Sequence, residues 1–248
     1  MERLTPPFYW LMTRLLKLVV LVVGRYEVVG VERAPATGPL IVVANHLHNA
    51  DPPLLGSAIP RRIRFMAKQE LFDGRPWGLF IRLFGAFPVR RFEADLQALR
   101  TAQAILKDGG VIGMFPEGHR SRGKGMQQPF PGTALIALRS GATILPCGIT
   151  GSERVRSPLI LLQNPRLRVV IGEPFTLPTP KRINAEAVHA GSEEIMRRIA
   201  ELVPPRYRGI YAGPAASSEP GAAGTDFGPT TVGGPDVEPA KPTHRRSR

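Results

Sequence analysis

The sequence has little cysteine, no long uninterrupted hydrophobic run and few acidic residues. A single cysteine, Cys147, among 248 residues excludes a disulfide framework and a zinc site built from cysteines, and it favours a reducing compartment. The longest apolar stretch, residues 8–23, is shorter than the roughly 20 residues that span a bilayer and contains Arg14 and Lys17. Only 20 Asp and Glu balance 33 Lys and Arg, and this net charge of +13 predicts an anionic partner: nucleic acid, acidic lipid or a phosphorylated substrate.

The sequence has enough apolar residues, 43%, for one packed domain with extensions. Segments rich in Val and Ile alternate with segments of helical pattern. The predicted strands are residues 26–31, 40–44, 63–67, 111–115, 143–149 and 167–171, and the predicted helices are residues 75–84, 94–107, 133–139 and 185–202. This alternation predicts an α/β fold with a mostly parallel central sheet flanked by helices.

The two ends of the chain differ from the middle. Residues 1–24 are predicted to form an amphipathic membrane-associating helix, because Leu11, Leu15 and Leu18 recur at helical spacing; the alternative is a core helix of the domain. Residues 212–248 contain six Gly and six Pro, have no apolar periodicity and carry no net charge, which is typical of a disordered tail. Residues 25–211 therefore form the predicted main domain, and the whole net charge of +13 lies in residues 1–211.

Polar residues follow the predicted strand 40–44, where active sites of open α/β sheets lie. His46 and Asp51 are five residues apart, so a hydrogen bond between them requires a turn. Asp51 precedes Pro52 and is a suitable N-cap for a helix that starts there. A histidine oriented by a carboxylate is a suitable general base for a hydroxyl group.

Basic residues gather in two further places. After the predicted strand 111–115, residues 116–125 place Arg, Lys and Gly around one hydroxyl, a composition that suits a phosphate. Residues 60–91 contain eight basic and two acidic residues, or nearly half of the net charge. Any single arginine in that segment is most simply part of a solvated basic face.

These segments resemble the 1-acyl-sn-glycerol-3-phosphate acyltransferase (glycerolipid acyltransferase) family. The family's four blocks, NHxxxxD, a GxxxxxR-like segment, FPEGTRS and a short strand with proline, are matched in order by residues 45–51, 85–91, 115–121 and 145–147. The resemblance covers residues 25–175. It implies transfer of a fatty acyl group from acyl-CoA or acyl carrier protein to a lysophospholipid, most simply 1-acylglycerol 3-phosphate, giving phosphatidic acid without a metal or cofactor.

The resemblance also implies roles for particular residues. His46 is the general base and Asp51 its partner, while the acceptor attacks the thioester directly. The residues implied to bind or shape the substrate are Arg91, Glu117, Gly118, Arg120 and Ser121. Glu117 is expected to orient an arginine or the histidine side of the site. The implied location is monotopic, on an anionic surface at the cytoplasmic face of the cell membrane, and nucleic acid is not an expected partner.

Two departures from the family pattern leave the acceptor headgroup open. His119 stands where the family usually has Thr, and residues 128–132 lack the Lys that many relatives have. An acyltransferase acting on another lyso-lipid thus remains compatible with the sequence. The sequence also permits three other functions. One is nucleotide binding by a phosphate-binding loop at residues 118–124, although Gly125 stands where the magnesium-binding hydroxyl would be. The others are a metal-dependent hydrolase using His46, His48 and Asp51, and a non-enzymatic protein that binds membranes or nucleic acid.

Overall fold

The computed structural model describes residues 5–23, 25–74, 76–90, 95–121, 123–155, 166–178 and 180–213. All of these residues belong to one compact unit, Met1–Ser217. The predicted tail lies outside the described residues from position 214 onward, as do Arg91 of the predicted site and Arg122.

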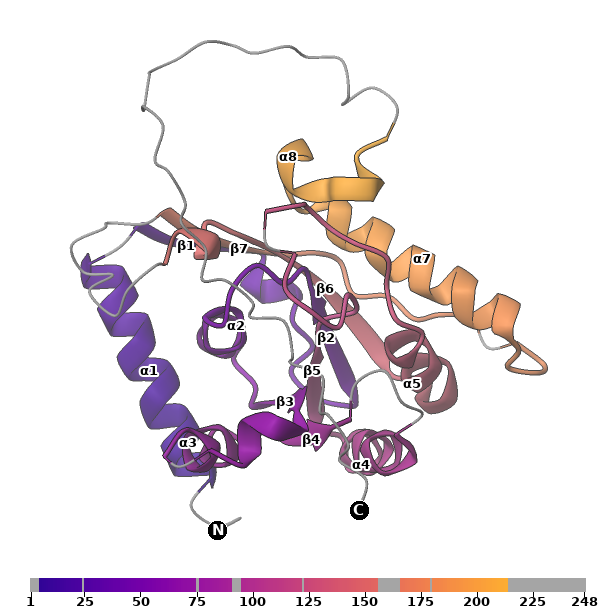
Figure 1. Cartoon of the computed structure of the whole chain (residues 1–248), viewed down its shortest axis with the longest axis horizontal. Helices are drawn as coiled ribbons and strands as arrows, with labels where there is room; N and C mark the ends of the chain where they lie inside the picture. Colours follow the sequence, from indigo (N-terminus) through magenta and orange to yellow (C-terminus); the bar gives the residue numbers. More distant parts are fainter. Residues whose placement is uncertain are drawn as a thin grey trace, which may run out of the picture. The chain divides into compact units, whose positions relative to one another are not determined.

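The described chain contains a seven-stranded sheet in the order β1-β7-β6-β2-β5-β3-β4 (Figure 1). All neighbouring strands are parallel except β6 and β7, which confirms the predicted mostly parallel α/β fold. The strands are β1 (Arg25–Val29), β2 (Leu40–Ala44), β3 (Ile63–Lys68), β4 (Phe87–Val89), β5 (Val111–Met114), β6 (Thr143–Thr150) and β7 (Arg166–Ile171). Every residue of β2 is buried, as expected for a central strand covered on both faces.

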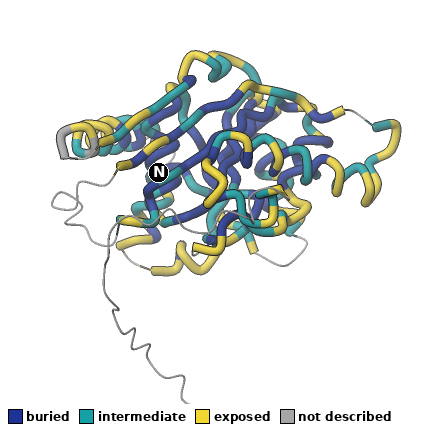
Figure 2. The backbone as a smooth tube through the Cα atoms, turned by 90° about the horizontal axis from the view of Figure 1, so that it is seen from above, coloured by how far each residue is buried: buried dark blue, intermediate teal, exposed yellow. Residues whose placement is uncertain are grey.

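Helices cover both faces of the sheet. They are α1 (Thr5–Val23), α2 (Asp51–Ala58), α3 (Trp77–Leu83), α4 (Leu96–Lys107), α5 (Gly132–Ser140), α7 (Ala185–Glu201) and α8 (Pro205–Arg208). Alternate residues of β2 face opposite sides: Ile41 and Val43 pack with α4, α5 and α7, whereas Leu40 and Val42 pack with α1 and α2. Figure 2 shows the resulting pattern, with buried strands inside and exposed helix surfaces outside.

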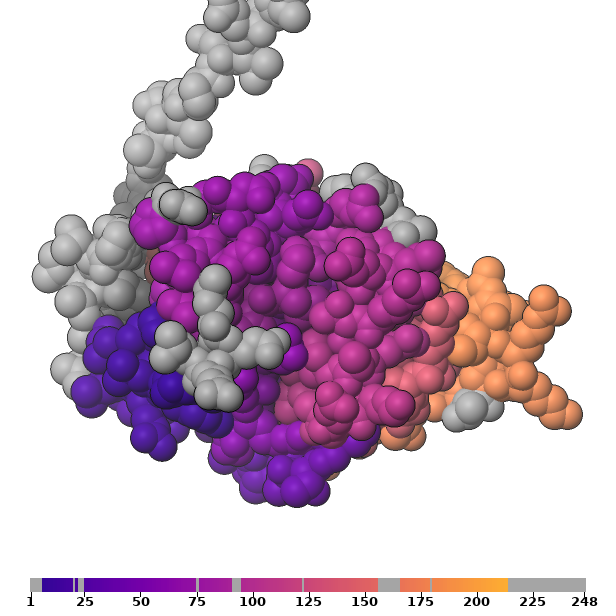
Figure 3. All heavy atoms as spheres, turned by 90° about the horizontal axis from the view of Figure 1, so that it is seen from below, coloured from indigo at the N-terminus to yellow at the C-terminus, as the bar shows by residue number. Residues whose placement is uncertain are grey.

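Helix α1 has one face against the domain and one face exposed. Tyr9 is fully buried, and its hydroxyl accepts a hydrogen bond from Ile63 N at 3.1 Å. Leu11, Leu15 and Leu18, at helical spacing, are 50–61% exposed. Figure 3 shows this helix (indigo) at the surface beside the purple segments that include α3, which it contacts. The buried face fits the alternative of a core helix, and membrane association of the exposed face stays a prediction.

Within the described chain, no helix is both long and apolar enough to cross a membrane. Cys147 is buried in β6, where it packs in the core. The sheet brings the carboxyl ends of β2 and β5 to one edge, because the two strands are parallel neighbours. The segments that follow them, which carry the first and third sequence blocks, therefore meet there.

Candidate active site

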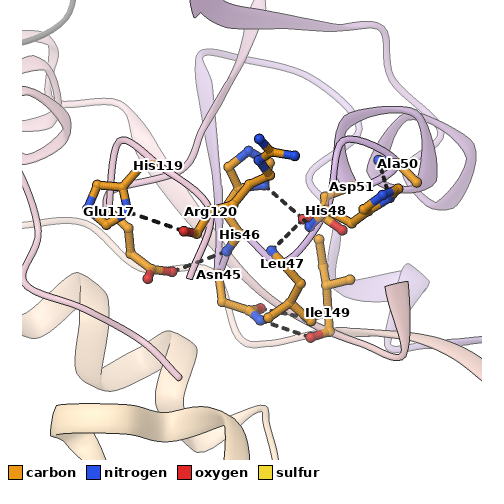
Figure 4. Close-up of polar contacts among 10 residues, drawn as sticks. All are labelled: Asn45, His46, Leu47, His48, Ala50, Asp51, Glu117, His119, Arg120 and Ile149. Carbon is orange, nitrogen blue, oxygen red and sulfur yellow. Dashed lines mark hydrogen bonds and ion pairs between the residues drawn. The ribbon is translucent and has the colours of Figure 1, made fainter. Parts of the chain in front are cut away.

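Asn45 fixes the chain where it leaves β2. Its side-chain Nδ2 donates to Ile149 O at 2.9 Å, and its Oδ1 accepts from Ile149 N at 2.8 Å, so the amide bonds both backbone groups of a residue in β6 (Figure 4). Asn45 is 1% exposed. This pairing continues the link between β2 and β6 beyond the last residue of β2 and holds the next residue, His46, at the sheet edge.

The structure brings His46 and Asp51 together. His46 Nδ1 lies 2.8 Å from Asp51 Oδ2, and the same oxygen accepts hydrogen bonds from Leu47 N at 2.7 Å and His48 N at 2.8 Å. A turn closes between them, with Asp51 N donating to His48 O at 3.1 Å. The predicted turn between His46 and Asp51 is therefore present.

The predicted capping role of Asp51 is wrong. Helix α2 begins at Asp51 itself, its N-cap residue is Ala50, and no side chain caps it. The carboxylate of Asp51 instead turns back toward the preceding loop, where three N–H groups lie within reach of one oxygen. Satisfying those buried donors outweighs the cap, because Pro at the start of α2 removes a donor that a cap would otherwise serve.

These contacts define which nitrogen of His46 is free to act. When Nδ1–H donates a hydrogen bond to Asp51, the Nε2 atom keeps its lone pair and can take a proton from another group. The ring is stacked on Phe115 with centroids 4.1 Å apart, and His46 is 8% exposed. The imidazole of His46 is therefore held on two sides, and it also lines a cavity.

Glu117 connects the third sequence block to His46. It is fully buried; Oε1 accepts from His46 N at 3.2 Å and Oε2 accepts from Gln127 N at 2.9 Å. The carbonyl group of His46 is also bonded to the third block, because Ser121 N donates to His46 O at 2.8 Å. Burial raises the pKa of Glu117 to about 7, although both backbone N–H groups oppose that rise. Of the two expected orientations, the carboxylate thus faces the histidine side of the site.

The cavity beside His46 has a volume of about 690 Å³ and two chemically different parts. One part is apolar and is formed mainly by Phe65, Trp77, Phe80, Ile81, Phe84 and Phe115. The other part is polar and cationic and is formed by His119, Arg120, Ser121, Lys124 and Gln127. A molecule with a hydrocarbon chain and an anionic head matches both kinds of lining, and His46 lines the same cavity.

The structure places the predicted site residues in three groups. His46, Arg120 and Ser121 line the cavity, and the Oγ atom of Ser121 is buried without a hydrogen-bond partner among the described residues. Asp51 and Glu117 lie behind the wall and bond His46. Gly118 lies in the turn after β5 with φ +66°, where a Cβ atom would come within 2.7 Å of the Phe130 ring. Arg91 lies outside the described residues.

Sequence reasoning missed several residues of the site. The amide clamp of Asn45, the aromatic wall from Phe65 and Phe80, and Gln127, whose backbone bonds Glu117, were not predicted as site residues. Asn45 had a signal, since it opens the first sequence block, and Lys124 had one in the basic loop. No local pattern indicates Gln127, because its contact depends on the path of the loop between β5 and α5.

The two histidines of the first block do not converge on one point. His46 Nδ1 bonds Asp51, whereas His48 Nδ1 accepts from Ala50 N at 3.3 Å. In the described part of the chain, no three His, Cys, Asp or Glu residues are grouped so as to hold a metal ion. The arrangement of these residues does not support a ligand set made of His46, His48 and Asp51.

Comparison with known proteins gives a consistent result. The sequence model of the Acyltransferase family matches residues 25–150, just over half of the chain. A 1-acyl-sn-glycerol-3-phosphate acyltransferase of Bacillus subtilis is 28% identical over 199 residues, which cover 75% of this chain and 96% of that protein. A Streptococcus pneumoniae protein of the same name is 32% identical over 167 residues, covering 65% of this chain and 60% of that protein.

A solved structure has a similar fold. The crystal structure of a 1-acyl-sn-glycerophosphate (LPA) acyltransferase from Thermotoga maritima superposes with a TM-score of 0.60 at 23% identity, covering 80% of this chain and 78% of the other. The likeness extends over most of the described chain, so the sheet and its helices form the shared part.

Proposed function

The chain belongs to the acyltransferase family, and from that premise we propose that it transfers a fatty acyl group from acyl-CoA or acyl carrier protein to the free hydroxyl of a lysophospholipid. The acceptor is 1-acylglycerol 3-phosphate and the product is phosphatidic acid, the reaction for which its B. subtilis and S. pneumoniae relatives are named. The observation that carries the proposal is the buried His46–Asp51 pair, whose histidine lines a cavity with one apolar and one cationic part.

In this mechanism His46 is the general base and Asp51 its partner. The Nε2 atom takes the proton of the acceptor hydroxyl while the hydroxyl oxygen attacks the thioester carbonyl carbon. The C–S bond then breaks, and the leaving thiolate receives the proton from the imidazolium, which restores the histidine. Asp51 stabilises the positive charge that forms on the ring, because its carboxylate accepts a charge-assisted hydrogen bond from Nδ1–H.

The acceptor phosphate belongs at the cationic part of the cavity. Arg120 supplies a guanidinium group, and Ser121, which also lines the cavity, carries a hydroxyl whose Oγ atom is buried without a partner among the described residues. Gly118 and Glu117 shape the turn that presents them, and Arg91 remains a predicted third contact. His119 favours a second candidate, an acyltransferase that acts on another lyso-lipid. Its imidazole lines this part of the cavity, where relatives usually have the small hydroxyl of a threonine.

The membrane surface is proposed as the place of reaction. Exposed leucines on α1 form an apolar stripe, with Arg14 and Lys17 at other positions on the helix. We assign residues 1–24 to membrane association and residues 25–211 to the acyltransferase domain, with the tail from 212 onward outside it. An anionic bilayer suits the net positive charge of the domain, and a cytoplasmic face gives access to intracellular thioesters.

The test is an acyl-transfer assay with purified protein, each thioester donor and a panel of lysophospholipids. We expect phosphatidic acid as the main product, and we expect His46→Ala to lose about 10²- to 10⁴-fold in rate, as is typical for removal of a general base. His189→Ala, on the exposed face of α7, is the matched control and should keep full activity. Near-normal turnover by folded His46→Ala would refute the proposed mechanism.

A further inference from the structure

Two distant parts of the chain meet behind the cationic part of the cavity. We call residues 123–127 the pocket loop, which contributes Lys124 and Gln127 to the cavity, and Pro205–Tyr211 the C-terminal segment. Met126 N donates to Tyr207 O at 2.9 Å, and Ile210 N donates to Met126 O at 3.2 Å. Both backbone groups of one pocket-loop residue are therefore held by the C-terminal segment, whose helix α8 is seen beyond the end of α7 in Figure 1.

The contact is too close for side chains. Gly125 and Gly209 both have positive φ angles, +72° and +54°, and face each other. A Cβ atom on Gly209 would lie 2.2 Å from Met126 O, and one on Gly125 would lie 2.6 Å from the Gly209 Cα. Two glycines at these places let the two backbones touch directly, which any other residue pair would prevent without movement of the backbone.

Both partners are anchored in the domain. Met126 is 1% exposed and packs in the same hydrophobic core as Tyr207, which is 8% exposed. The Tyr207 hydroxyl donates to Glu153 at 2.7 Å, after the end of β6. The C-terminal segment is thus fixed to the sheet independently of the pocket loop, and it can serve as a support for that loop.

The pocket loop in turn connects to the proposed base. Gln127 N donates to Glu117 Oε2, and Glu117 Oε1 accepts from His46 N. Hydrogen bonds therefore link the C-terminal segment to Met126, and Gln127 through Glu117 to the backbone of His46; the peptide bond between Met126 and Gln127 joins the two links. None of the residues 205–211 lines this cavity, so the segment has no direct contact with its contents.

We infer that the C-terminal segment positions the pocket loop, and through Gln127 and Glu117 the backbone of His46, for acyl transfer. This inference rests on the proposed function and adds positioning residues to it: Tyr207, Gly209 and Ile210. They lie outside residues 25–150, so the family match gives no indication of them. The physical reason is that a displacement of about 1 Å in a catalytic group can reduce the rate about 10²-fold.

The test compares two variants at one position. Ile210→Pro removes the N–H group that reaches Met126, at a residue of a short 3-10 helix whose φ angle proline tolerates. Ile210→Ala keeps that N–H group and is the matched control. The side chain of Ile210 is 54% exposed, so neither variant removes core packing. Three measurements are made on each variant: the kinetics of acyl transfer, which give kcat and acceptor KM, the thermal unfolding midpoint, and hydrogen–deuterium exchange of residues 123–127.

We expect Ile210→Pro to lose about tenfold or more in kcat/KM, with faster exchange at residues 123–127 and an unchanged rate of exchange in β2 and β5. Ile210→Ala should match the wild type in all three. Equal kcat/KM and equal exchange in the two variants would overturn the inference, as would a rate loss that merely follows a lowered unfolding midpoint. If the wild type makes no phosphatidic acid, the proposed function fails, and the exchange data alone then decide the positioning claim.

A second pair covers the case in which proline prevents folding. Gly209→Ala introduces a Cβ atom against Met126 O, whereas Gly213→Ala, also at positive φ, has no heavy atom within 4 Å of the new Cβ. Both variants place alanine at a positive φ angle, and only Gly209→Ala adds a close contact with the pocket loop. Faster exchange and a lower kcat/KM only in Gly209→Ala support the inference, and identical behaviour of the two variants contradicts it.

Discussion

Replacing Asp51 with Asn separates the charge of the carboxylate from its geometry. Asp51 Oδ2 accepts hydrogen bonds from two backbone N–H groups, Leu47 N and His48 N, as well as from His46 Nδ1. The two backbone donors require an oxygen at that position, so the asparagine amide should keep its oxygen there. His46 should then still donate its Nδ1 proton, with Nε2 free as the base, and only the negative charge beside the ring is lost.

The size of the effect follows from that single change. A hydrogen bond to a charged group contributes about 1.5–3 kcal/mol and one between neutral groups about 0.5–1.5 kcal/mol, so the charge alone accounts for about 1–1.5 kcal/mol. Each 1.36 kcal/mol of transition-state stabilisation corresponds to about tenfold in rate, and we therefore expect Asp51→Asn to reduce kcat about 5- to 13-fold. The new amide nitrogen takes the place of Oδ1, which is buried and has no partner among the described residues, so a stability loss of about 1–3 kcal/mol should accompany it.

The assay is the initial rate of acyl transfer, read beside the thermal unfolding curve of each variant. Asp108→Asn, at the exposed end of α4, makes the same chemical change away from the site and should leave both quantities unchanged. Wild-type turnover by Asp51→Asn would refute the reasoning, since the charge would then contribute nothing. A loss as large as that of His46→Ala would also refute it, because the amide would then have turned its nitrogen toward the ring.

Two further predictions concern the buried carboxyl behind the site and the exposed face of α1. Because burial raises the pKa of Glu117 to about 7 from its usual 4.5, the folded protein retains a proton that the unfolded chain releases, and its stability should fall as pH rises between these values. The fall should be on the order of 3 kcal/mol, and urea unfolding at several pH values should show it in the wild type and not in Glu117→Gln; equal slopes would disprove the assignment. Replacing Leu11, Leu15 and Leu18 together with Gln should abolish retention on anionic vesicles with the unfolding midpoint unchanged, because these side chains are at least half exposed. Leu96→Gln, on α4 and 60% exposed, is the control, and equal retention of both proteins would exclude α1 as the membrane contact.

The fold was predictable because the signal for most strands is local. A run such as that in β2, Leu-Ile-Val-Val-Ala, reads as a buried strand without knowledge of its neighbours, and its bounds were predicted correctly. Strand β4 was missed because it has only three residues and includes Pro88. Proline is compatible with the edge of a sheet, where β4 lies, but that position is a property of the whole topology.

The charge of residues 60–91 shows the limit of composition. Eight basic residues there suggested a basic face, but the guanidinium of Arg61 donates to the carbonyl oxygens of Pro35, Gly38 and Gly109. This arginine joins three loops at the amino ends of the strands and serves the fold. A count of charges does not show which guanidinium groups bond to backbone carbonyl oxygens within the fold, because those oxygens belong to residues distant in sequence.

The catalytic pair was predictable for a different reason from the residues that support it. His46 and Asp51 are five residues apart, so one turn of fixed chemistry is enough to join them, and sequence spacing carries that information. Glu117 follows β5 and Gln127 lies in the pocket loop, so each is distant from His46 in sequence. Their contacts meet at one carboxylate, because Glu117 accepts from both His46 N and Gln127 N. Many different sequences could form these loops, so sequence spacing does not indicate the contacts. Only the folded chain shows that the Glu117 carboxylate joins His46 to a loop held by the C-terminal segment. Residues that hold a site in place are therefore harder to read from sequence than residues that perform its chemistry, and variants at Ile210 address this group directly.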